Sequence, residues 1–239
     1  MIPKIVHYCW FGKGEKPEKV KECIKSWKDK LPGYQIIEWN EENFDYTALK
    51  YTKEAYEARK FAFVSDVARV KALYEFGGIY FDTDVEVLKD FDDSILEKDC
   101  VLGFEEGNYI ATSFMASKQY HPLMKDFYDL YINLDFYDEK GHIISGTNVS
   151  KLTNMLSKQG LVRNNEYQEI GDISIYPQEY FSPYDYGNCV YKITEKSICV
   201  HHFLVSWMSK KEIIKKKLKK IIVPIIGVDN MNKIRRMFK

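Results

Sequence analysis

The chain has 239 residues, of which 45% are hydrophobic, 29% are charged and 15% are aromatic. This composition is typical of a folded globular protein and argues against intrinsic disorder. The formal net charge is zero, which argues against a whole-protein field directed at nucleic acid, and the five cysteines, an odd number without a C-x-x-C pair, argue against a disulfide framework.

The predicted elements alternate between strands and helices. In chain order we expect a strand at 5–10, a helix from Pro17 to the Pro32-Gly33 stop, a strand at 34–39, a long helix at 53–76, and strands at 79–81 and 85–88. Weaker patterns predict strands near 101–104, 112–116, 173–176 and 198–202, and helices near 122–132 and 149–159. This alternation predicts an α/β fold with a largely parallel sheet.

The neutral total charge hides an acidic body and a basic tail. Residues 209–239 hold eleven basic and two acidic residues, so they carry +9 and residues 1–208 carry −9. We therefore predict a globular domain at 1–208 and a basic amphipathic helix at 209–239. Such a helix fits an anchor on an anionic membrane surface, or a helix packed on its own body or on a neighbouring subunit. The start lacks a signal-peptide pattern and no apolar run reaches the roughly 18 residues of a span, so we expect a cytoplasmic protein or one on the inner face of the membrane.

Two aspartates, Asp82 and Asp84, follow the strand at 79–81 directly. Ligands of open α/β sheets bind beyond the carboxyl ends of strands, and paired carboxylates suit a hard divalent cation such as Mg²⁺ or Mn²⁺. The pair therefore indicates a metal that shares its shell with a nucleoside diphosphate. A second D-x-D, Asp90-Phe91-Asp92, fits a solvated turn that caps a short helix.

Asp66 and Arg69 lie three residues apart on the long predicted helix, so they share a face. The functional interpretation places Arg69 on a diphosphate or a sugar, and Asp66 on sugar hydroxyls. The alternative is a buried ion pair, because a buried charge needs a partner.

Three segments carry a family resemblance. The runs 65–69 and 73–85, which contain Asp66, Arg69 and the Asp82 pair, resemble the DXD sugar-binding region of glycosyltransferase family 32, whose members are often called capsular polysaccharide synthesis proteins. Residues 2–12 are similar to the family's opening strand, and 201–207 resembles its closing His…Ser-Trp signature. The resemblance implies a GT-A fold, that is, a Rossmann-like, mostly parallel sheet flanked by helices. It also implies a nucleotide-sugar donor with UDP favoured, Mn²⁺ or Mg²⁺, and retention of anomeric configuration.

The resemblance also implies roles for individual residues. Asp84 would be the main metal ligand, and Asp82 would share the metal and contact the donor. One of His201 and His202 would complete the metal shell. His201 is preferred for its spacing to Trp207, and strand alternation places the two histidines on opposite faces. The donor-binding candidates are Trp10 on the nucleobase, Tyr8, Asp66, Arg69, Asp82, Thr83, and Ser206 with Trp207 on the diphosphate. Asp82, Asp84, Arg69 and Trp207 are the catalytic candidates.

The acceptor side is the least specified by the sequence. Family members often carry a Gly- or Pro-containing turn before the helix that lines this side, and here 145–148 opens such a helix without proline. The acceptor-side candidates are Thr147, Asn148, Glu105 and Asn108.

The expected activity is transfer of a hexosyl group from a nucleotide sugar to a glycan or lipid-linked hydroxyl, in surface polysaccharide or glycoconjugate synthesis. Whether the chain forms a homo-oligomer stays open, and no nucleic-acid partner is expected. One alternative is a haloacid-dehalogenase-type Mg²⁺ phosphatase, since residues 81–87 fit its D-x-D motif. That motif normally occupies the first strand, however, and we find no convincing downstream acidic pair. A second alternative is a non-catalytic scaffold on a membrane surface.

Overall fold

The structure, a computed structural model, describes residues 1–144, 146–204 and 227. The predicted helical tail at 209–239 thus lies outside the described residues, apart from Gly227. The helices are α1 (Glu18–Lys30), α2 (Lys50–Glu57), α3 (Phe61–Phe76), α4 (Asp93–Leu96), α5 (Pro122–Ile132), α6 (Asn148–Ser157) and α7 (Gln178–Phe181), with a 3₁₀ turn at Glu106–Asn108. The strands are β1 (Ile5–Cys9), β2 (Gln35–Trp39), β3 (Gly78–Phe81), β4 (Val85–Val87), β5 (Cys100–Glu105), β6 (Tyr109–Ile110), β7 (Phe114–Ser117), β8 (Gln168–Ile170), β9 (Ile173–Tyr176), β10 (Tyr184–Asp185), β11 (Val190–Tyr191) and β12 (Cys199–His201).

The main sheet has the order β2-β1-β3-β7-β5-β9-β8, with β6 paired to β5. β1 is parallel to β2 and β3, and β9 is parallel to β5, whereas β7 is antiparallel to both β3 and β5. β2, β1, β3, β5 and β9 therefore run in one direction, so their carboxyl ends meet at one edge. The predicted α/β class is confirmed, but β7 is an antiparallel insertion, and β6 and β8 are likewise antiparallel to β5 and β9, which the sequence pattern did not indicate.

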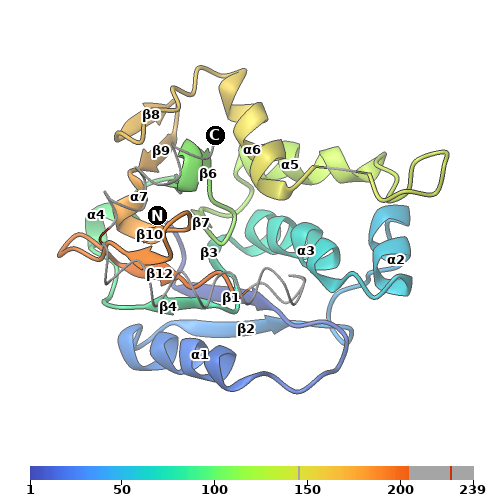
Figure 1. The fold of residues 1–239 in the computed structure, drawn as a ribbon, viewed down its shortest axis with the longest axis horizontal. Coiled ribbons are helices and arrows are strands. Elements are labelled where there is room, and N and C mark those ends of the chain that lie inside the picture. Colours follow the sequence, from blue (N-terminus) through green and yellow to red (C-terminus); the bar gives the residue numbers. More distant parts are fainter. Residues whose placement is uncertain (145, 205–226, 228–239) are drawn as a thin grey trace.

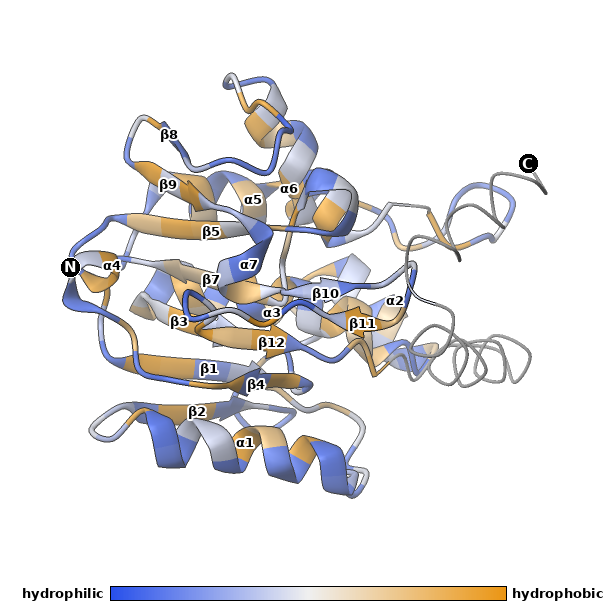
Figure 2. Ribbon diagram, turned by 60° about the vertical axis from the view of Figure 1, so that its left-hand side comes forward, coloured by the Kyte–Doolittle hydropathy of each residue, from blue (hydrophilic) through white to orange (hydrophobic). Residues whose placement is uncertain are grey.

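Helices cover both faces of this sheet (Figure 1). On one face α2, α3, α5 and α6 pack against the sheet, and on the other face α1, α4 and α7 do so. Strand alternation divides the core between these faces: Tyr80 of β3 packs on the first side, and Ile79 and Phe81 on the second. Figure 2 shows hydrophobic residues along the central strands, between the two helical layers.

Two expectations about element boundaries are corrected. The long helix expected at 53–76 is two helices, because α2 ends in a Schellman motif with Arg59 at a φ of 57°. The N–H of Arg59 donates to the carbonyl of Tyr56 at 2.8 Å, and that of Lys60 to the carbonyl of Ala55 at 2.8 Å. The strand expected at 85–88 exists as β4, but it leaves the main sheet and pairs antiparallel with β12.

The turn from α3 into β3 requires glycine. Gly77 has a φ of 65° and Gly78 a φ of 100°, and a Cβ at Gly78 would lie 2.5 Å from the carbonyl oxygen of Ile5. Helix α3 can thus lead directly into β3, which pairs with β1. This turn fixes the position of Asp82 at the end of β3.

A buried histidine fastens the same turn. His7 is 0% exposed, its Nε2 lies 2.8 Å from the carbonyl oxygen of Gly77, and its Nδ1 lies 3.1 Å from the indole Nε1 of Trp39. The indole can only donate and the carbonyl can only accept, so the neutral ring carries its proton on Nε2. Burial lowers the pKa of His7 to about 4, although the bond to Gly77 opposes this shift.

The first prediction concerns stability against pH. The unfolded chain takes up the His7 proton near pH 6.5, whereas the folded chain takes it up only near pH 4. Protonation therefore favours the unfolded chain, so the unfolding free energy is at its full value above pH 6.5 and decreases as the pH falls toward 4. The wild type should lose about 3 kcal/mol more unfolding free energy between pH 7 and pH 4 than His7→Gln does. Urea denaturation at both pH values measures this difference. Equal losses in the two proteins would contradict the role given to His7.

Candidate functional site

The two aspartates after β3 meet a histidine from the far end of the described chain. Asp82, Asp84 and His201 each offer a ligand atom, and these atoms all lie within 4.8 Å of one another. Antiparallel pairing of β12 with β4 sets His201 opposite Val85, the residue that follows Asp84. The backbone register therefore brings together side chains that are more than a hundred residues apart in sequence.

Asp84 is fixed on two sides. Its Oδ1 lies 3.2 Å from Nε2 of His201, and its Oδ2 accepts from the N–H of Leu204 at 2.6 Å. Burial raises the pKa of this carboxyl, but His201 and the hydrogen bonds from His201 and Leu204 outweigh burial and hold the pKa below its usual value. Asp84 is therefore a carboxylate at neutral pH, the form that binds a metal ion.

The two histidines point to opposite sides, as strand alternation predicts. His202 has Nε2 2.8 Å from Oε2 of Glu86 and Nδ1 2.7 Å from the hydroxyl of Tyr191, so both of its ring nitrogens are engaged. The remaining nitrogen of His201, Nδ1, is buried and has no hydrogen-bond partner within the described ranges. Two carboxylates and an imidazole with one unsatisfied nitrogen fit a divalent cation such as Mn²⁺.

Arg69 is buried and bound by protein groups. Its Nη1 lies 3.0 Å from Oδ1 of Asp82, and its Nη2 lies 3.0 Å from Oδ1 of Asp66. Nη1 also donates to the carbonyl of Thr112 at 2.7 Å, and the guanidinium lies 4.6 Å from the ring centre of Tyr80. The buried ion pair, which the sequence left as an alternative, is thus present, and Arg69 holds both acids in place.

Acidic groups outnumber cations around this site. Burial raises the pKa of Asp66 to about 6, with Arg69 opposing and Asp82 adding to the shift. Burial likewise raises the pKa of Glu105 to about 7, where His201 opposes and Asp82 adds to the shift. Asp66, Glu105 and the two ligand aspartates therefore share a small region with the charge of Arg69, with Lys151 near Asp66, and with His201, whose pKa is lowered by burial but raised on balance by Asp84 and the neighbouring acids. A bound cation would relieve this excess of negative charge.

The other donor candidates lie along β1 and the turn after β3. The indole N–H of Trp10 donates to the carbonyl of Gly14 at 2.7 Å, and the Lys16 ammonium lies 5.5 Å from the Trp10 ring centre. Tyr8 is buried, and its hydroxyl donates to Glu38 at 2.5 Å. Thr83 lies between the two aspartates, and Ser206 and Trp207 lie outside the described residues. The donor roles of these residues stay predictions.

Three acceptor-side candidates have structural partners. Thr147 caps α6 by accepting from the N–H of Ser150 at 3.2 Å, and Asn148 is buried, with Nδ2 3.1 Å from the backbone carbonyl oxygen of Asp66. Asn108 donates to the carbonyl of Arg163 at 2.9 Å. Glu105, at the end of β5, is the acceptor-side candidate that interacts electrostatically with His201 and Asp82.

Sequence reasoning missed Tyr80 and Lys151. The hydroxyl of Tyr80 donates to Oδ1 of Asp82 at 2.9 Å, and Lys151 on α6 is close enough to Asp66 to oppose the rise in its pKa. Strand parity could have found Tyr80, because side chains two positions apart on a strand point to one face. No sequence signal links Lys151 to Asp66, since α6 reaches α3 only through tertiary packing.

Comparison with known proteins matches part of the chain to one family. Residues 17–102 match the family described as "Glycosyltransferase sugar-binding region containing DXD motif". The match contains the Asp66–Arg69 pair and the Asp82–Asp84 pair. These residues are thus similar to that sugar-binding region, and the resemblance drawn from the sequence is confirmed at that level. The layering expected for a GT-A fold is present: β2, β1, β3, β5 and β9 run in one direction, and helices cover both faces of the sheet.

Curated relatives match parts of the chain. Inositol phosphoceramide mannosyltransferase 1 of Schizosaccharomyces pombe is 26% identical over 134 residues, which are 52% of this chain and 40% of the relative. Inositol phosphoceramide mannosyltransferase 3 of the same organism is 34% identical over 92 residues, 35% of this chain and 24% of the relative. The aligned parts thus span well under half the length of these relatives.

Solved structures align more widely but with low identity. The apo-form glycosyltransferase GlyE of Streptococcus pneumoniae TIGR4 covers 88% of this chain and 55% of its own, with 14% identity and a TM-score of 0.49. A glycosyltransferase involved in the glycosylation of the major capsid of PBCV-1 covers 91% of this chain and 100% of its own, with 12% identity and a TM-score of 0.45.

The second prediction follows from the burial of Arg69. Arg69→Met should lower the unfolding free energy by about 3 kcal/mol, because it leaves two largely buried carboxylates without their partner. Lys71→Met on the same helix is the matched control, since Lys71 pairs with Glu75 at the surface and should cost less than about 1 kcal/mol. Guanidinium denaturation gives both values. Equal costs for the two variants would show that Arg69 does not hold the acids.

Proposed function

We propose that this chain is a metal-dependent retaining glycosyltransferase. It transfers a hexosyl group from a nucleoside diphosphate sugar, with UDP-sugars favoured, to a hydroxyl of a glycan or lipid-linked acceptor. The observation that carries the proposal is the Asp82–Asp84–His201 cluster at the carboxyl end of β3, within a chain that has the DXD sugar-binding region. The family match favours this function over the phosphatase and scaffold alternatives.

Asp84, Asp82 and His201 would hold the Mn²⁺ or Mg²⁺ ion. When bound, a divalent cation offsets the negative charge that develops on the departing diphosphate. Asp84 is ionised and oriented by Leu204, and Asp82 is oriented by Arg69 and Tyr80. The ligands are thus fixed before the donor arrives, which lowers the entropic cost of assembling the site.

Other residues would bind the donor. Trp10 would stack on the nucleobase, Asp66 would accept hydrogen bonds from the sugar hydroxyls, and Thr83 would lie against the donor between the two ligand aspartates. Trp207 with Ser206 would hydrogen-bond the diphosphate.

The transition state resembles an oxocarbenium ion, so stabilising the leaving group supplies most of the catalysis. No residue is assigned as a nucleophile, and attack from the front face, guided by the leaving phosphate, accounts for retention. Glu105, whose pKa lies near 7, would accept a hydrogen bond from the acceptor hydroxyl.

The nature of the acceptor and the location remain proposals. The names of two curated relatives describe mannosyl transfer to inositol phosphoceramide, which favours a lipid-linked acceptor here. None of the helices within the described ranges combines the length and apolar character needed to cross a bilayer. A cytoplasmic position, with the tail at 209–239 on an anionic membrane surface, and a role in surface polysaccharide synthesis are part of the proposal.

The third prediction tests metal-dependent donor binding. UDP-glucose, UDP-galactose, their N-acetyl forms and GDP-mannose are screened by thermal shift with and without Mn²⁺. At least one donor at 100 times its Kd should stabilise the wild type by about 2.7 kcal/mol, only with Mn²⁺. Asp84→Asn should abolish this shift and Asp92→Asn, in the exposed second D-x-D, should retain it. Equal shifts after EDTA treatment would refute the metal role.

The fourth prediction separates the two histidines. His201→Asn should weaken Mn²⁺ binding at least tenfold, as expected when a ligand is lost, whereas His202→Asn should change it less than threefold. Isothermal titration with MnCl₂ in the presence of UDP measures both affinities. The reverse order would assign the metal shell to His202.

A further inference from the structure

A second cavity lies on the other side of α3 from the acidic site. It has a volume of about 480 Å³ and lies between β2, the segment 43–49, α2, α3 and α5. Lys71 and Glu75 line it, and at 3.6 residues per turn they lie roughly 140–180° around the helix from Asp66. A ligand in this cavity therefore cannot be the sugar that Asp66 and Asp82 would hold.

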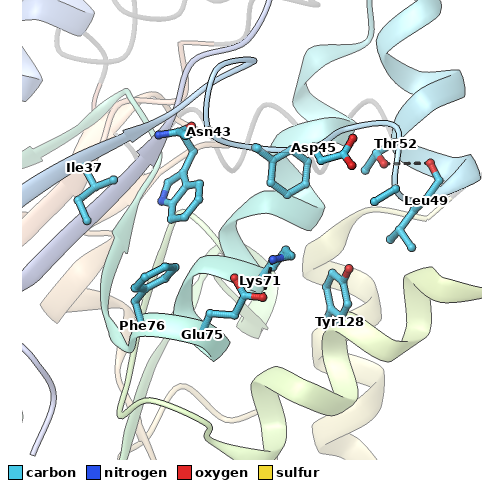
Figure 3. Close-up of a pocket in the computed structure, with 12 residues that line it drawn as sticks. Ile37, Asn43, Asp45, Leu49, Thr52, Lys71, Glu75, Phe76 and Tyr128 are labelled. Carbon is cyan, nitrogen blue, oxygen red and sulfur yellow. Dashed lines mark hydrogen bonds and ion pairs between the residues drawn. The ribbon is translucent and has the colours of Figure 1, made fainter.

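Aromatic rings form much of the cavity wall. Trp39, Phe44, Phe76 and Tyr128 line it, and Phe76 is 42% exposed. The ring centres of Trp39 and Phe76 lie 5.6 Å apart. Figure 3 draws the Lys71–Glu75 pair between the ring of Phe76 and the ring of Tyr128. Flat apolar faces thus stand next to charged groups.

Some polar groups of the wall are already engaged. Asn43 donates to the carbonyl of Glu38 at 2.8 Å and accepts from the N–H of Asn40 at 2.9 Å. Thr52 donates to the carbonyl of Leu49 at 3.1 Å. These side chains hold the segment 43–49 in place.

Other polar groups of the wall keep unused bonding capacity. Oδ1 of Asp45 accepts from Thr47, and Oε1 of Glu75 pairs with Lys71, while the second oxygen of each carboxylate has no bond in the described part of the chain. The hydroxyl of Tyr128 likewise has no hydrogen bond among the described residues. Burial first, and the Glu75 carboxylate next, raise the pKa of Tyr128, so this hydroxyl stays protonated and can donate.

The charges of the wall select among ligand classes. Lys71 is neutralised by Glu75, and Asp45 adds a further negative charge, so the wall repels phosphates and other anions. An acyl chain would cover the partly buried Glu75 carboxylate without bonding it, which costs free energy. A neutral sugar ring has apolar C–H faces and many hydroxyls. Its faces can stack on the aromatic rings of the wall, and its hydroxyls can donate to the free carboxylate oxygens.

We propose that the cavity bounded by Trp39, Asp45, Glu75, Phe76 and Tyr128 is a saccharide-binding site, separate from the donor site, for a neutral sugar unit. Phe76 and Tyr128 contact the ring faces, and Asp45 and Glu75 accept hydrogen bonds from the hydroxyls. The site holds a part of a glycan that does not react. This binding does not depend on the transferase reaction, so it is tested without nucleotide or metal.

The test uses three probes, methyl α-mannopyranoside, methyl β-glucopyranoside and maltotriose, titrated to 50 mM against the full chain. Amide shifts in a ¹H–¹⁵N spectrum locate binding, and the titration gives the Kd. At least one probe should shift residues 43–49 and the C-terminal half of α3. Phe76→Ala and Tyr128→Ala should each weaken its binding at least fivefold. Leu130→Ala, an exposed side chain on the same helix as Tyr128, should leave the Kd unchanged.

Three results would overturn the proposal. One is the absence of shifts in this region with all three sugars while the wild-type spectrum is that of a folded protein. Another is binding that both ring variants retain within twofold. The third is binding of hexanoate by this region with none of the sugars bound, which would identify an acyl-chain pocket. Asp45→Asn and Glu75→Gln, which keep side-chain volume, check the same result should a ring variant unfold.

Discussion

The arrangement of the site depends on one buried cation. Arg69 lies on a helix packed against the sheet, where an unpaired guanidinium would be strongly destabilising. Asp66, one turn earlier on the same helix, and Asp82, at the end of β3, supply the opposing charges. Because the same guanidinium binds both, helix α3 and the carboxyl end of β3 cannot shift independently. The position of Asp82, and with it the acidic pair, follows from that constraint.

An excess of negative charge accompanies this geometry. Four carboxyl groups, those of Asp66, Asp82, Asp84 and Glu105, lie near Arg69, Lys151 and His201, and burial first, with Asp82 adding to it, raises the pKa values of Asp66 and Glu105. Perturbed carboxyl pKa values of this kind cluster at functional sites. We therefore propose a divalent cation, and with it a diphosphate that the cation attracts, as the ligand of this cluster.

Much of the site follows from local patterns in the sequence. The spacing of Asp66 and Arg69 predicts a shared helix face, the double glycine predicts the abrupt entry into β3, and strand alternation separates His201 from His202. Other features depend on tertiary contacts that no short pattern encodes. Arg59 ends α2 in a left-handed conformation usually taken by glycine, β7 enters the sheet antiparallel, and β4 leaves it to pair with β12. The approach of Glu105 to His201 and the aromatic cavity beyond α3 likewise arise only when distant segments pack together.

The central claim is that Asp82, Asp84 and His201 bind one divalent cation beside the diphosphate of a nucleotide. The most direct measurement is a crystal of the protein grown with MnCl₂ and UDP, with diffraction recorded at the manganese absorption edge. The account predicts one strong anomalous peak in contact with Asp84, flanked by Asp82 and His201 and by the nucleotide's phosphate oxygens. Nucleotide bound elsewhere, or bound here with no anomalous peak among these three side chains, would contradict it.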